Sequence, residues 1–325
     1  MKIVILEDYA LTPGDLDWSP LYELDADIER YHRTTQEQAP ERIADAEYVI
    51  VNKVWISDEI LERCPKLKWI GLTATGIDSL DTAACARHGV AVANVPGYST
   101  QSVAQMTWAL LLELCQCAGR YDTAVRKGYW KDAPAQEHGI FEQRELWGKT
   151  LGIVGYGAIG RSVAQIAKAF GMQVLCSTRT PREGEEAVEF VPLQELFRRS
   201  DAISLHCPAT EETKGLVSDA LLRECKRGAL LVNTARGSLV DEQAVCRALS
   251  DGTLGGFAAD VLCVEPADIT RPIFNAPNTI FTPHAAWATK ESLGRLSAEV
   301  CANLKAFLQG ETMELQKWLV FSTSE

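Results

Sequence analysis

Residues 150–171 read TLGIVGYGAIGRSVAQIAKAFG, and this stretch decides how the rest of the chain is interpreted. An apolar run leads into Gly155, Gly157 and Gly160, which are spaced G-x-G-x-x-G, and an amphipathic run follows them. Gly155 permits a tight turn, Gly157 lets a pyrophosphate approach the backbone, and Gly160 lets the helix pack close to the strand. The helix N-terminus then offers unpaired N–H groups to the phosphates. The stretch predicts a dinucleotide-binding turn; the alternative is a glycine turn that serves packing alone.

The residues after the next predicted strand indicate which dinucleotide to expect. In this fold a carboxylate usually stands there, where it binds the adenosine ribose and repels a 2′-phosphate. The stretch 174–183 reads VLCSTRTPRE and has no acid at that place. Ser177 and Thr178 can donate hydrogen bonds instead, and Arg179, with Arg182, can neutralise a phosphate. We therefore expect NADP(H) to be preferred, while an ordinary exposed loop would leave NAD(H) open.

Short apolar runs alternate with helical stretches on both sides of this turn. Buried strands separated by helices indicate a parallel sheet covered on both faces, so we predict an α/β protein with two doubly wound parallel-sheet domains. A long helical stretch, apolar on nearly all sides, starts at residue 99 and separates the two series, and the last helix is expected to return to the first domain. The predicted domains are 1–100 with 289–325, and 101–288. Strands are predicted at 2–6, 48–52, 67–72, 90–95, 151–154, 174–177, 188–191, 202–206, 229–233, 256–261 and 279–282, and helices at 99–128, 159–170, 192–199, 218–226, 241–250 and 289–308.

Composition excludes several classes of partner. The chain has 44 acids against 32 bases and a net charge of −12, with no cluster of cations, so nucleic-acid binding is not expected. The longest apolar run, residues 108–118, is too short for a membrane span and contains Glu113. Ten cysteines without a C-x-x-C pair predict reduced thiols and no metal site. No targeting segment is recognised, so a cytoplasmic location is expected.

Four side chains of catalytic type follow predicted strands in the C-terminal part of the chain. The carboxyl ends of parallel strands line the ligand crevice. Arg236, Asp260, Glu265 and His284 are therefore expected to converge beside the nicotinamide. They lie in LVNTARGSLVDEQAV (231–245), AADVLCVEP (258–266) and FTPHAAWATK (281–290).

These residue types fit the reduction of a ketone. Hydride transfer leaves an alkoxide that needs a proton, and His284 is suited to supply it near neutral pH. Glu265 would orient the imidazole and favour its charged form. Arg236 would bind a carboxylate of the substrate and polarise the neighbouring carbonyl. Taken singly, each has an ordinary alternative, namely a turn residue for His284 and Glu265 and a solvated ion pair for Arg236.

These segments are similar, in order and spacing, to the D-isomer-specific 2-hydroxyacid dehydrogenases over nearly the whole chain. The resemblance implies two Rossmann-like domains with the active site in the cleft between them. It places the arginine, glutamate and acid/base histidine of the family on Arg236, Glu265 and His284. The matching stretches are IGLTATGIDSLDTAACARHGVAVANVPGYST (70–100), GIVGYGAIGR (152–161), LHCPATEET (205–213), VNTARGSLVDE (232–242), DVLCVEP (260–266) and TPHAAWAT (282–289).

The resemblance also places further residues around the two ligands. Backbone N–H groups of Thr75 and Gly76 would bind the substrate carboxylate, and Asp260 would accept from the nicotinamide carboxamide. The set expected at the cofactor is Gly155, Gly157, Ala158, Ile159, Gly160, Ser177, Thr178, Arg179, His206, Cys207, Pro208, Thr213, Thr234, Ala235, Arg236, Asp260, His284, Ala286 and Val103. The set expected at the substrate is Asn52, Thr75, Gly76, Arg236, His284 and Trp287.

Within the family, VNKVWIS (51–57) and PHAAWATKE (283–291) resemble the glycerate dehydrogenase/hydroxypyruvate reductase branch, and STRTPRE is similar to its NADP-preferring members. The expected activity is NAD(P)H-dependent reduction of hydroxypyruvate or glyoxylate, with D-glycerate oxidation as the reverse. Another 2-keto acid (pyruvate, phenylpyruvate or a branched one) is the first alternative, and a dinucleotide-sensing protein on the same fold is the second. The long apolar helix and the family both suggest a homodimer, although packing between domains would explain the helix equally well.

Overall fold

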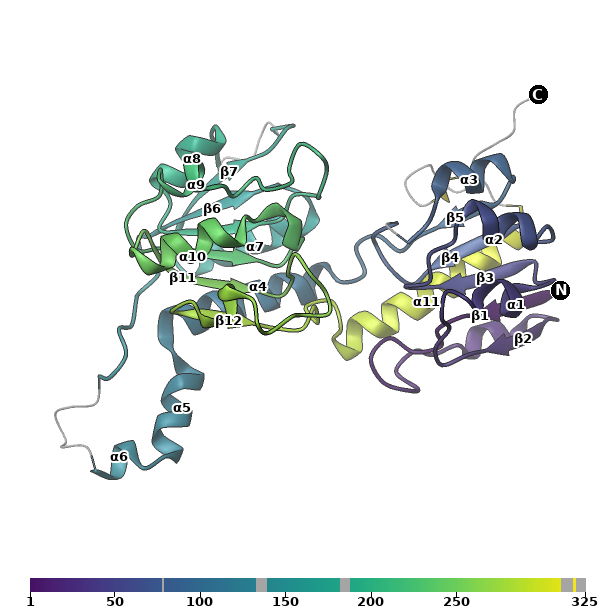
Figure 1. Cartoon of the computed structure of the whole chain (residues 1–325), viewed down its shortest axis with the longest axis horizontal. Helices are drawn as coiled ribbons and strands as arrows, with labels where there is room; N and C mark the ends of the chain where they lie inside the picture. The colour runs from purple at the N-terminus through teal and green to yellow at the C-terminus, as the bar shows by residue number, and fades with distance from the viewer. Residues whose placement is uncertain (78, 133–138, 182–187, 311–317, 320–325) are drawn as a thin grey trace. The chain divides into compact units, whose positions relative to one another are not determined.

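The chain forms two compact units (Figure 1). The first comprises Met1–Ser99 and Ala288–Glu325, and the second comprises Thr100–Trp287. Each contains a sheet of mainly parallel strands with helices, which confirms the predicted α/β class. The predicted phosphate ligand Arg182 lies outside the described residues. The computed structural model describes residues 1–77, 79–132, 139–181, 188–310 and 318–319.

The sheet of the first unit has six strands in the order β13-β5-β4-β3-β1-β2. All neighbours are parallel except β13, which pairs antiparallel with β5. The strand β2 was not predicted, because its sequence DIER is polar and its side chains are exposed or half-buried. The strands are β1 (Lys2–Ile5), β2 (Asp27–Arg30), β3 (Tyr48–Val51), β4 (Trp69–Leu72), β5 (Ala91–Ala93) and β13 (Trp318–Leu319).

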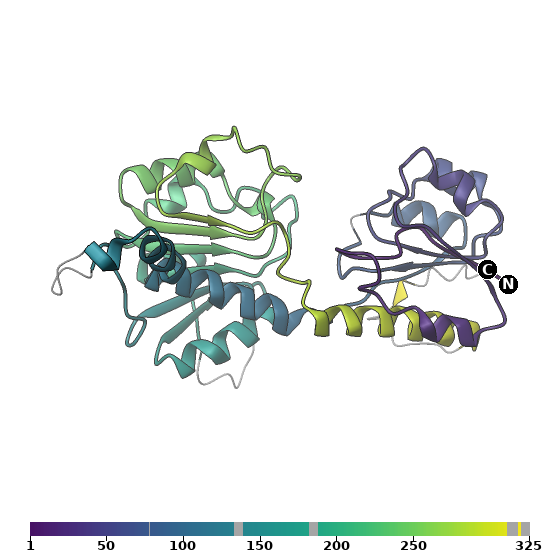
Figure 2. The same cartoon turned by 90° about the horizontal axis from the view of Figure 1, so that it is seen from below.

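Helices cover both faces of this sheet (Figure 2). On one face, Val49 and Ile70 belong to an apolar cluster with residues of the three short helices α1, α2 and α3. On the other, Tyr48 and Trp69 pack against Phe307 of α11, with ring centroids 6.2 and 6.5 Å apart. The last helix thus completes the first unit. The helices are η1 (Ser19–Glu23), α1 (Ala39–Ile43), α2 (Asp58–Arg63), α3 (Thr82–Arg87) and α11 (Lys290–Leu308).

The second unit has a wholly parallel sheet of seven strands in the order β12-β11-β10-β9-β6-β7-β8. The chain runs outward from β6 to β8, then returns to β9 beside β6 and runs outward the other way. The direction therefore reverses between β6 and β9, and such a switch point is where parallel sheets bind ligands. The strands are β6 (Thr150–Val154), β7 (Gln173–Ser177), β8 (Glu189–Phe190), β9 (Ala202–Leu205), β10 (Ala229–Asn233), β11 (Leu254–Ala259) and β12 (Thr279–Phe281).

Two apolar clusters sandwich this sheet. One joins α4 and α7 to side chains such as Ile153 and Val232, and the other joins α8, α9 and α10 to side chains such as Leu205 and Leu231. Adjacent strand residues alternate between the clusters, so both faces of the strands are buried. The helices are α4 (Thr100–Gln116), α5 (Ala118–Arg126), α6 (Tyr129–Asp132), α7 (Ala158–Ala169), α8 (Leu193–Arg199), α9 (Asp219–Leu222), η2 (Gly237–Leu239), α10 (Glu242–Ser250) and η3 (Pro272–Asn275).

The single helix predicted over residues 99–128 is wrong, because the chain breaks into α4 and α5 at Cys117. Cys117 has a φ of 54°. The carboxylate of Glu113 accepts the N–H of Gly119 at 3.1 Å and so satisfies a donor in the first turn of the new helix. The apolar side of α4 is packed inside its own unit, where Trp108 stacks on Phe170 at 4.8 Å. No helix in the described part of the chain is long and apolar enough to cross a membrane.

Candidate active site

The glycine turn follows β6 at the switch point, and each of its glycines has a different neighbourhood. Gly155 has a φ of +95°, and a Cβ there would lie 2.6 Å from the backbone of His206 and Cys207. A Cβ on Gly160 would lie 2.3 Å from the carbonyl oxygen of Gly155. A Cβ on Gly157 would meet nothing within 4 Å. Packing therefore requires the first and third glycines, whereas the second leaves open space into which a pyrophosphate fits.

The N-terminus of α7 faces this open space with favourable electrostatics for an anion. Gly157 is its N-cap residue and provides no side-chain cap, and the first turn, which includes Ala158 and Ile159, has no acid. Arg161, half-buried one turn into the helix, forms no ion pair with any residue that the structure describes. Arg161 was not predicted as a site residue, although it ends the motif GIVGYGAIGR. The N–H groups of this first turn, the helix dipole and the Arg161 cation together fit a dinucleotide pyrophosphate.

The end of β7 adjoins the same turn. The carbonyl oxygen of Ser177, the last residue of β7, accepts the N–H of Gly155 at 2.8 Å. Ser177 and Thr178 are half-buried, and Arg179 is exposed. No ion pair within the described ranges involves Arg179. The end of β7 beside the glycine turn thus carries two hydroxyl side chains followed by an exposed arginine.

The loop after β9 closes the other side of the turn. Its backbone at His206 and Cys207 contacts Gly155. The imidazole Nε2 of His206 is 2.8 Å from the hydroxyl of the buried Ser204, and burial lowers the pKa of His206 to about 3, so the ring is neutral at working pH. The Thr213 hydroxyl donates to the carbonyl of Pro208 at 2.8 Å and so shapes the loop.

Arg236 is exposed on the loop that follows β10. A side chain missed from sequence, the fully buried Asn233, holds this loop: its Oδ1 accepts the N–H of Ala235 at 3.0 Å and its Nδ2 donates to the carbonyl of Arg236 at 2.9 Å. The hydroxyls of Thr234 and Thr107 are 2.8 Å apart. Thr107 lies on α4, one turn after the buried Val103, so the loop is also tied to that helix.

His284 and Glu265 lie side by side although 19 positions separate them. Their Nδ1 and Oε2 atoms are 2.6 Å apart. The second carboxylate oxygen of Glu265 accepts the N–H of Leu262 at 2.9 Å. Because a carboxylate only accepts, Nδ1 carries the hydrogen of the pair and Nε2 is left to face a ligand. The arrangement suits an imidazole that holds and transfers a proton at Nε2.

Asp260, which is 2% exposed, holds the loop that carries His284. Asp260 accepts from the Thr282 hydroxyl at 2.6 Å and from the N–H groups of Ala285 and Ala286 at 2.9 Å each. The predicted bond from Asp260 to a nicotinamide carboxamide stays a prediction, while these three bonds give the residue a structural role. On the other side, the indole of Trp287 donates to the carbonyl of His284 at 2.8 Å, and this fixes a residue whose φ is 54°.

Three predicted substrate residues belong to the first unit, near the carboxyl ends of β3 and β4. Thr75 donates its hydroxyl to Val95 at 2.9 Å. The N–H of Asn52 is bound at 3.0 Å by Glu7, a residue that the sequence analysis missed. Glu7 also accepts from the next two N–H groups of that loop, and burial raises its pKa. Thr75, Gly76 and Asn52 are therefore on ordered loops of one unit, whereas Arg236, Glu265 and His284 are on the other.

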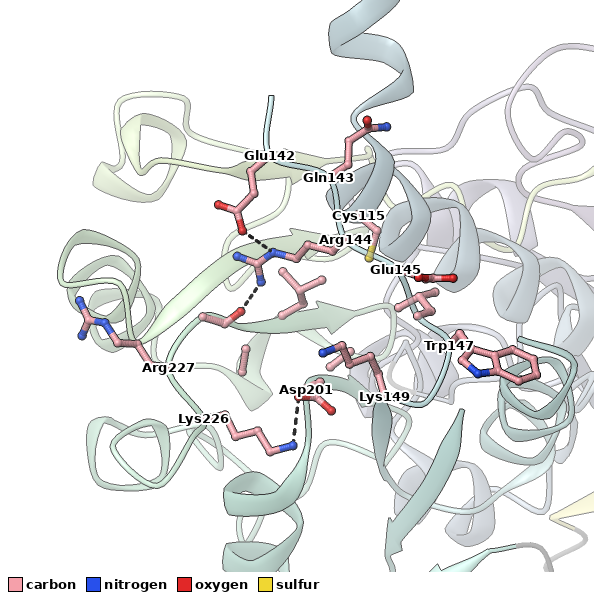
Figure 3. Close-up of a pocket in the computed structure, with 15 residues that line it drawn as sticks. Cys115, Glu142, Gln143, Arg144, Glu145, Trp147, Lys149, Asp201, Lys226 and Arg227 are labelled. Carbon is pink, nitrogen blue, oxygen red and sulfur yellow. Dashed lines mark hydrogen bonds and ion pairs between the residues drawn. The ribbon is translucent and has the colours of Figure 1, made fainter. Parts of the chain in front are cut away.

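A cavity of about 650 Å³ lies at the opposite edge of the second sheet, where β6, β9 and β10 begin (Figure 3). Two of its cations have acidic partners: Arg144 binds the Gly228 carbonyl and lies 3.5 Å from Glu142, and Lys226 lies 3.0 Å from Asp201. None of the predicted site residues lines it. No cluster of three potential metal ligands occurs among the described residues.

A dinucleotide turn at the switch point and an acid/base pair on the same sheet edge define a nicotinamide-dependent oxidoreductase. Residues 108–286, more than half of the chain, match the model of the D-isomer specific 2-hydroxyacid dehydrogenase, NAD binding domain. The chain therefore belongs to the D-isomer-specific 2-hydroxyacid dehydrogenase family.

Named relatives cover nearly the whole chain. A hydroxypyruvate reductase of Blautia hydrogenotrophica is 39% identical over 97% of this chain and 99% of its own length. A glycerate dehydrogenase of Methylorubrum extorquens is 38% identical over 85% of this chain and 87% of its own. Among solved structures, the D-lactate dehydrogenase from Aquifex aeolicus, complexed with NAD and lactic acid, is 30% identical with a TM-score of 0.83 and covers all of both chains. The comparisons thus agree with the observed fold on the family and on the use of a nicotinamide dinucleotide.

Proposed function

We propose that the protein reduces hydroxypyruvate or glyoxylate to the corresponding 2-hydroxy acid and oxidises D-glycerate in the reverse direction. The observation that carries the proposal is the 2.6 Å contact between His284 and Glu265 on the sheet edge that also carries the glycine turn. The names of the hydroxypyruvate reductase and glycerate dehydrogenase relatives support this substrate class.

The side chains have separate tasks in this reaction. A bound nicotinamide dinucleotide supplies the hydride. His284, held at Nδ1 by Glu265, gives the proton at Nε2 to the oxygen of the substrate carbonyl, so that the ketone gains one hydride and one proton. The exposed guanidinium of Arg236 binds the substrate carboxylate and stabilises the charge that develops on the carbonyl oxygen. In the oxidation of D-glycerate, neutral His284 accepts the proton.

For the cofactor, we propose that NADP(H) is preferred over NAD(H). Ser177 and Thr178 offer hydroxyls at the end of β7, and Arg179 is exposed beside them without an ion pair among the described residues. An acid that would repel a 2′-phosphate is missing from this place. Guanidinium groups bind phosphates through bidentate hydrogen bonds, and this supports a preference for NADP(H).

The direct test is a panel of substrates assayed with NADPH and with NADH. The panel contains hydroxypyruvate, glyoxylate, pyruvate, phenylpyruvate and a branched 2-keto acid, with hydroxyacetone as a matched control that lacks the carboxylate. We expect the highest kcat/KM for hydroxypyruvate or glyoxylate with NADPH, and little turnover of hydroxyacetone. A higher kcat/KM for one of the other 2-keto acids would show that this acid, and not hydroxypyruvate or glyoxylate, is the preferred substrate. Tight cofactor binding without any turnover would indicate a dinucleotide-sensing protein.

We also propose a homodimer. The apolar side of α4 is packed within its own unit, so it gives no support. Better support comes from α5 and α6, which extend away from the sheet of the second unit (Figure 1). α5 buries none of its residues, and Val125 and Trp130 are 41% and 66% exposed. Sedimentation velocity should give a mass twice the 35.7 kDa of the chain.

A cytoplasmic location is part of the proposal as well. All ten cysteines are free thiols, and most of them are buried or half-buried. Burial raises the pKa of several, including Cys176 and Cys301, to about 12, so these thiols are inert. Unpaired cysteines in this number are typical of a reducing compartment.

A further inference from the structure

Two consecutive backbone N–H groups, those of Leu262 and Cys263, join two parts of the proposed site. The N–H of Leu262 donates to Oε1 of Glu265 at 2.9 Å, while Oε2 of the same carboxylate binds His284. The next N–H along the chain, that of Cys263, donates to Oε1 of Glu242 at 3.1 Å. Glu242 therefore binds the peptide group that directly follows the one bound to Glu265.

The peptide group between Leu262 and Cys263 packs closely against the loop that carries Arg236. A Cβ on Gly237 would lie 2.0 Å from the carbonyl carbon of Leu262 and 2.5 Å from the nitrogen of Cys263, so only a glycine permits this approach. The Cys263 thiol donates to the carbonyls of Gly237 and Val240, at 3.2 and 3.4 Å. The peptide is thus clamped between the Arg236 loop on one side and Glu242 on the other.

Glu242 needs a cation because it is only 9% exposed. Arg271 supplies it: its Nη2 lies 2.6 Å from Oε2 of Glu242. The Nη1 atom of Arg271 is buried and has no hydrogen bond to any described residue, so the guanidinium is committed to this carboxylate. The two carboxylate oxygens of Glu242 thus bind different groups: Oε2 binds Arg271, and Oε1 accepts the Cys263 N–H.

We infer that Glu242 and Arg271 are positioning residues that set the orientation of the Glu265–His284 pair through the backbone at Leu262 and Cys263. The inference deepens the proposed function and rests on it. Neither residue touches the reacting atoms. Without Glu242, the Cys263 N–H loses its acceptor, and its peptide group loses one of its restraints. The preceding peptide group, which carries the Leu262 N–H, then holds Glu265 less firmly. The imidazole ring of His284 is then no longer held in one orientation, so Nε2 is not directed consistently at the substrate oxygen.

Steady-state kinetics of keto-acid reduction with Glu242→Ala test the inference. We expect kcat to fall roughly 10- to 100-fold, because small misplacements of a catalytic group have costs of that order. Cofactor affinity should stay within about twofold. The pH profile of kcat/KM should approach that of Glu265→Gln. Glu242→Gln, whose amide oxygen can still accept from Cys263, should recover part of the loss. Arg271→Met should lower kcat in the same direction, because Glu242 is then left buried without its cation.

The neighbouring acid supplies a matched control. Asp241 accepts the N–H groups of Gln243 and Ala244 at 3.0 and 3.1 Å and so caps the helix that Glu242 begins. Loss of this cap costs about 1 kcal/mol of stability. Asp241→Ala should therefore lower the melting temperature without changing kcat or the pH profile. If it lowers kcat as much as Glu242→Ala does, the effect belongs to the helix end and the inference fails.

A double variant separates a positioning role from a general structural one. If Glu242 acts through Glu265, then Glu242→Ala combined with Glu265→Gln should be no slower than Glu265→Gln alone. Multiplied losses would show that the two residues act independently and would overturn the inference. The inference would also be overturned if the wild-type enzyme is active and Glu242→Ala leaves its kcat unchanged.

A second readout does not depend on turnover. The Nδ1 proton of His284, identified by its disappearance in His284→Gln, should give a downfield proton resonance in ¹⁵N-histidine-labelled protein. It should broaden or vanish in Glu242→Ala and persist in Asp241→Ala. If Glu242→Ala does not fold, Glu242→Gln and Arg271→Met carry the test. Persistence of the resonance in all the Glu242 and Arg271 variants refutes the inference, whereas absence of turnover in the wild type refutes only the proposed function.

Discussion

The sharpest consequence of the glycine turn concerns Gly157, where Gly157→Ala should separate cofactor binding from folding. The backbone there has φ −77° and ψ −164°, which any residue adopts, and the added methyl group meets no protein atom within 4 Å. Replacement of glycine by alanine at such a position stabilises by about 0.4–1 kcal/mol. The melting temperature should therefore stay the same or rise slightly.

Cofactor binding should respond in the opposite way. The methyl group would occupy the open space that we assign to the pyrophosphate and would separate a phosphate from the N–H groups of α7. A hydrogen bond to a charged group contributes about 1.5–3 kcal/mol. Loss of one such bond weakens binding roughly 10- to 150-fold, because about 1.4 kcal/mol corresponds to a factor of ten. NADPH and NADH should lose affinity equally, since both carry the pyrophosphate.

The assay combines thermal unfolding with titration of the nicotinamide fluorescence, and Gly160→Ala is the matched control. The Cβ of Gly160→Ala would lie 2.3 Å from the carbonyl oxygen of Gly155. Overpacking of this kind costs about 1–3 kcal/mol, or roughly 2–12 °C for a domain of this size. If Gly157→Ala binds both cofactors as tightly as the wild type, the turn is not the pyrophosphate site. If it unfolds as early as Gly160→Ala, the space beside Gly157 is not open.

Three further outcomes are expected. His284→Ala should lower kcat of keto-acid reduction roughly 10²–10⁴-fold while cofactor affinity is kept, and unchanged turnover would exclude His284 as the proton donor. Arg179→Ala should weaken NADPH at least tenfold and NADH less than twofold in fluorescence titrations; equal losses would make Arg179 an ordinary surface residue. Burial lowers the pKa of His206 to about 3, whereas the unfolded value is about 6.5. Below pH 6.5 the unfolded chain therefore binds one more proton than the folded protein, and the free energy of unfolding decreases as the pH is lowered. Urea unfolding should show a loss of about 2 kcal/mol from this residue between pH 7 and pH 5 that His206→Gln lacks, and identical pH dependence in both proteins would contradict it.

Much of the fold could be predicted from the sequence, because its determinants are local. The central strands β6, β9 and β10 of the second sheet are marked by short apolar runs, since both faces of a parallel sheet are buried. The spacing of Gly155, Gly157 and Gly160 indicated a turn at the end of such a strand. The edge strand β2 was missed because it has no apolar run, and its side chains are not fully buried.

The break between α4 and α5 is a feature that local sequence patterns did not predict. The sequence on both sides of Cys117 is helical, and propensity alone predicts one helix through it. The break is accompanied by a hydrogen bond from Gly119 to the Glu113 carboxylate. Side-chain bonds of this kind have no periodicity and were not visible in the sequence.

The sequence by itself determined the fold class, the dinucleotide turn and the residue types needed to move a hydride and a proton. Only the tertiary structure decided which side chains hold those groups in place. Asn233 braces the Arg236 loop from within a strand, Asp260 holds the loop of His284, and Glu242 lies 21 positions before the N–H that it binds. These contacts join residues from different loops at one sheet edge. They exist because parallel strands bring their carboxyl ends together, and that proximity is a property of the folded sheet rather than of any one segment of the chain.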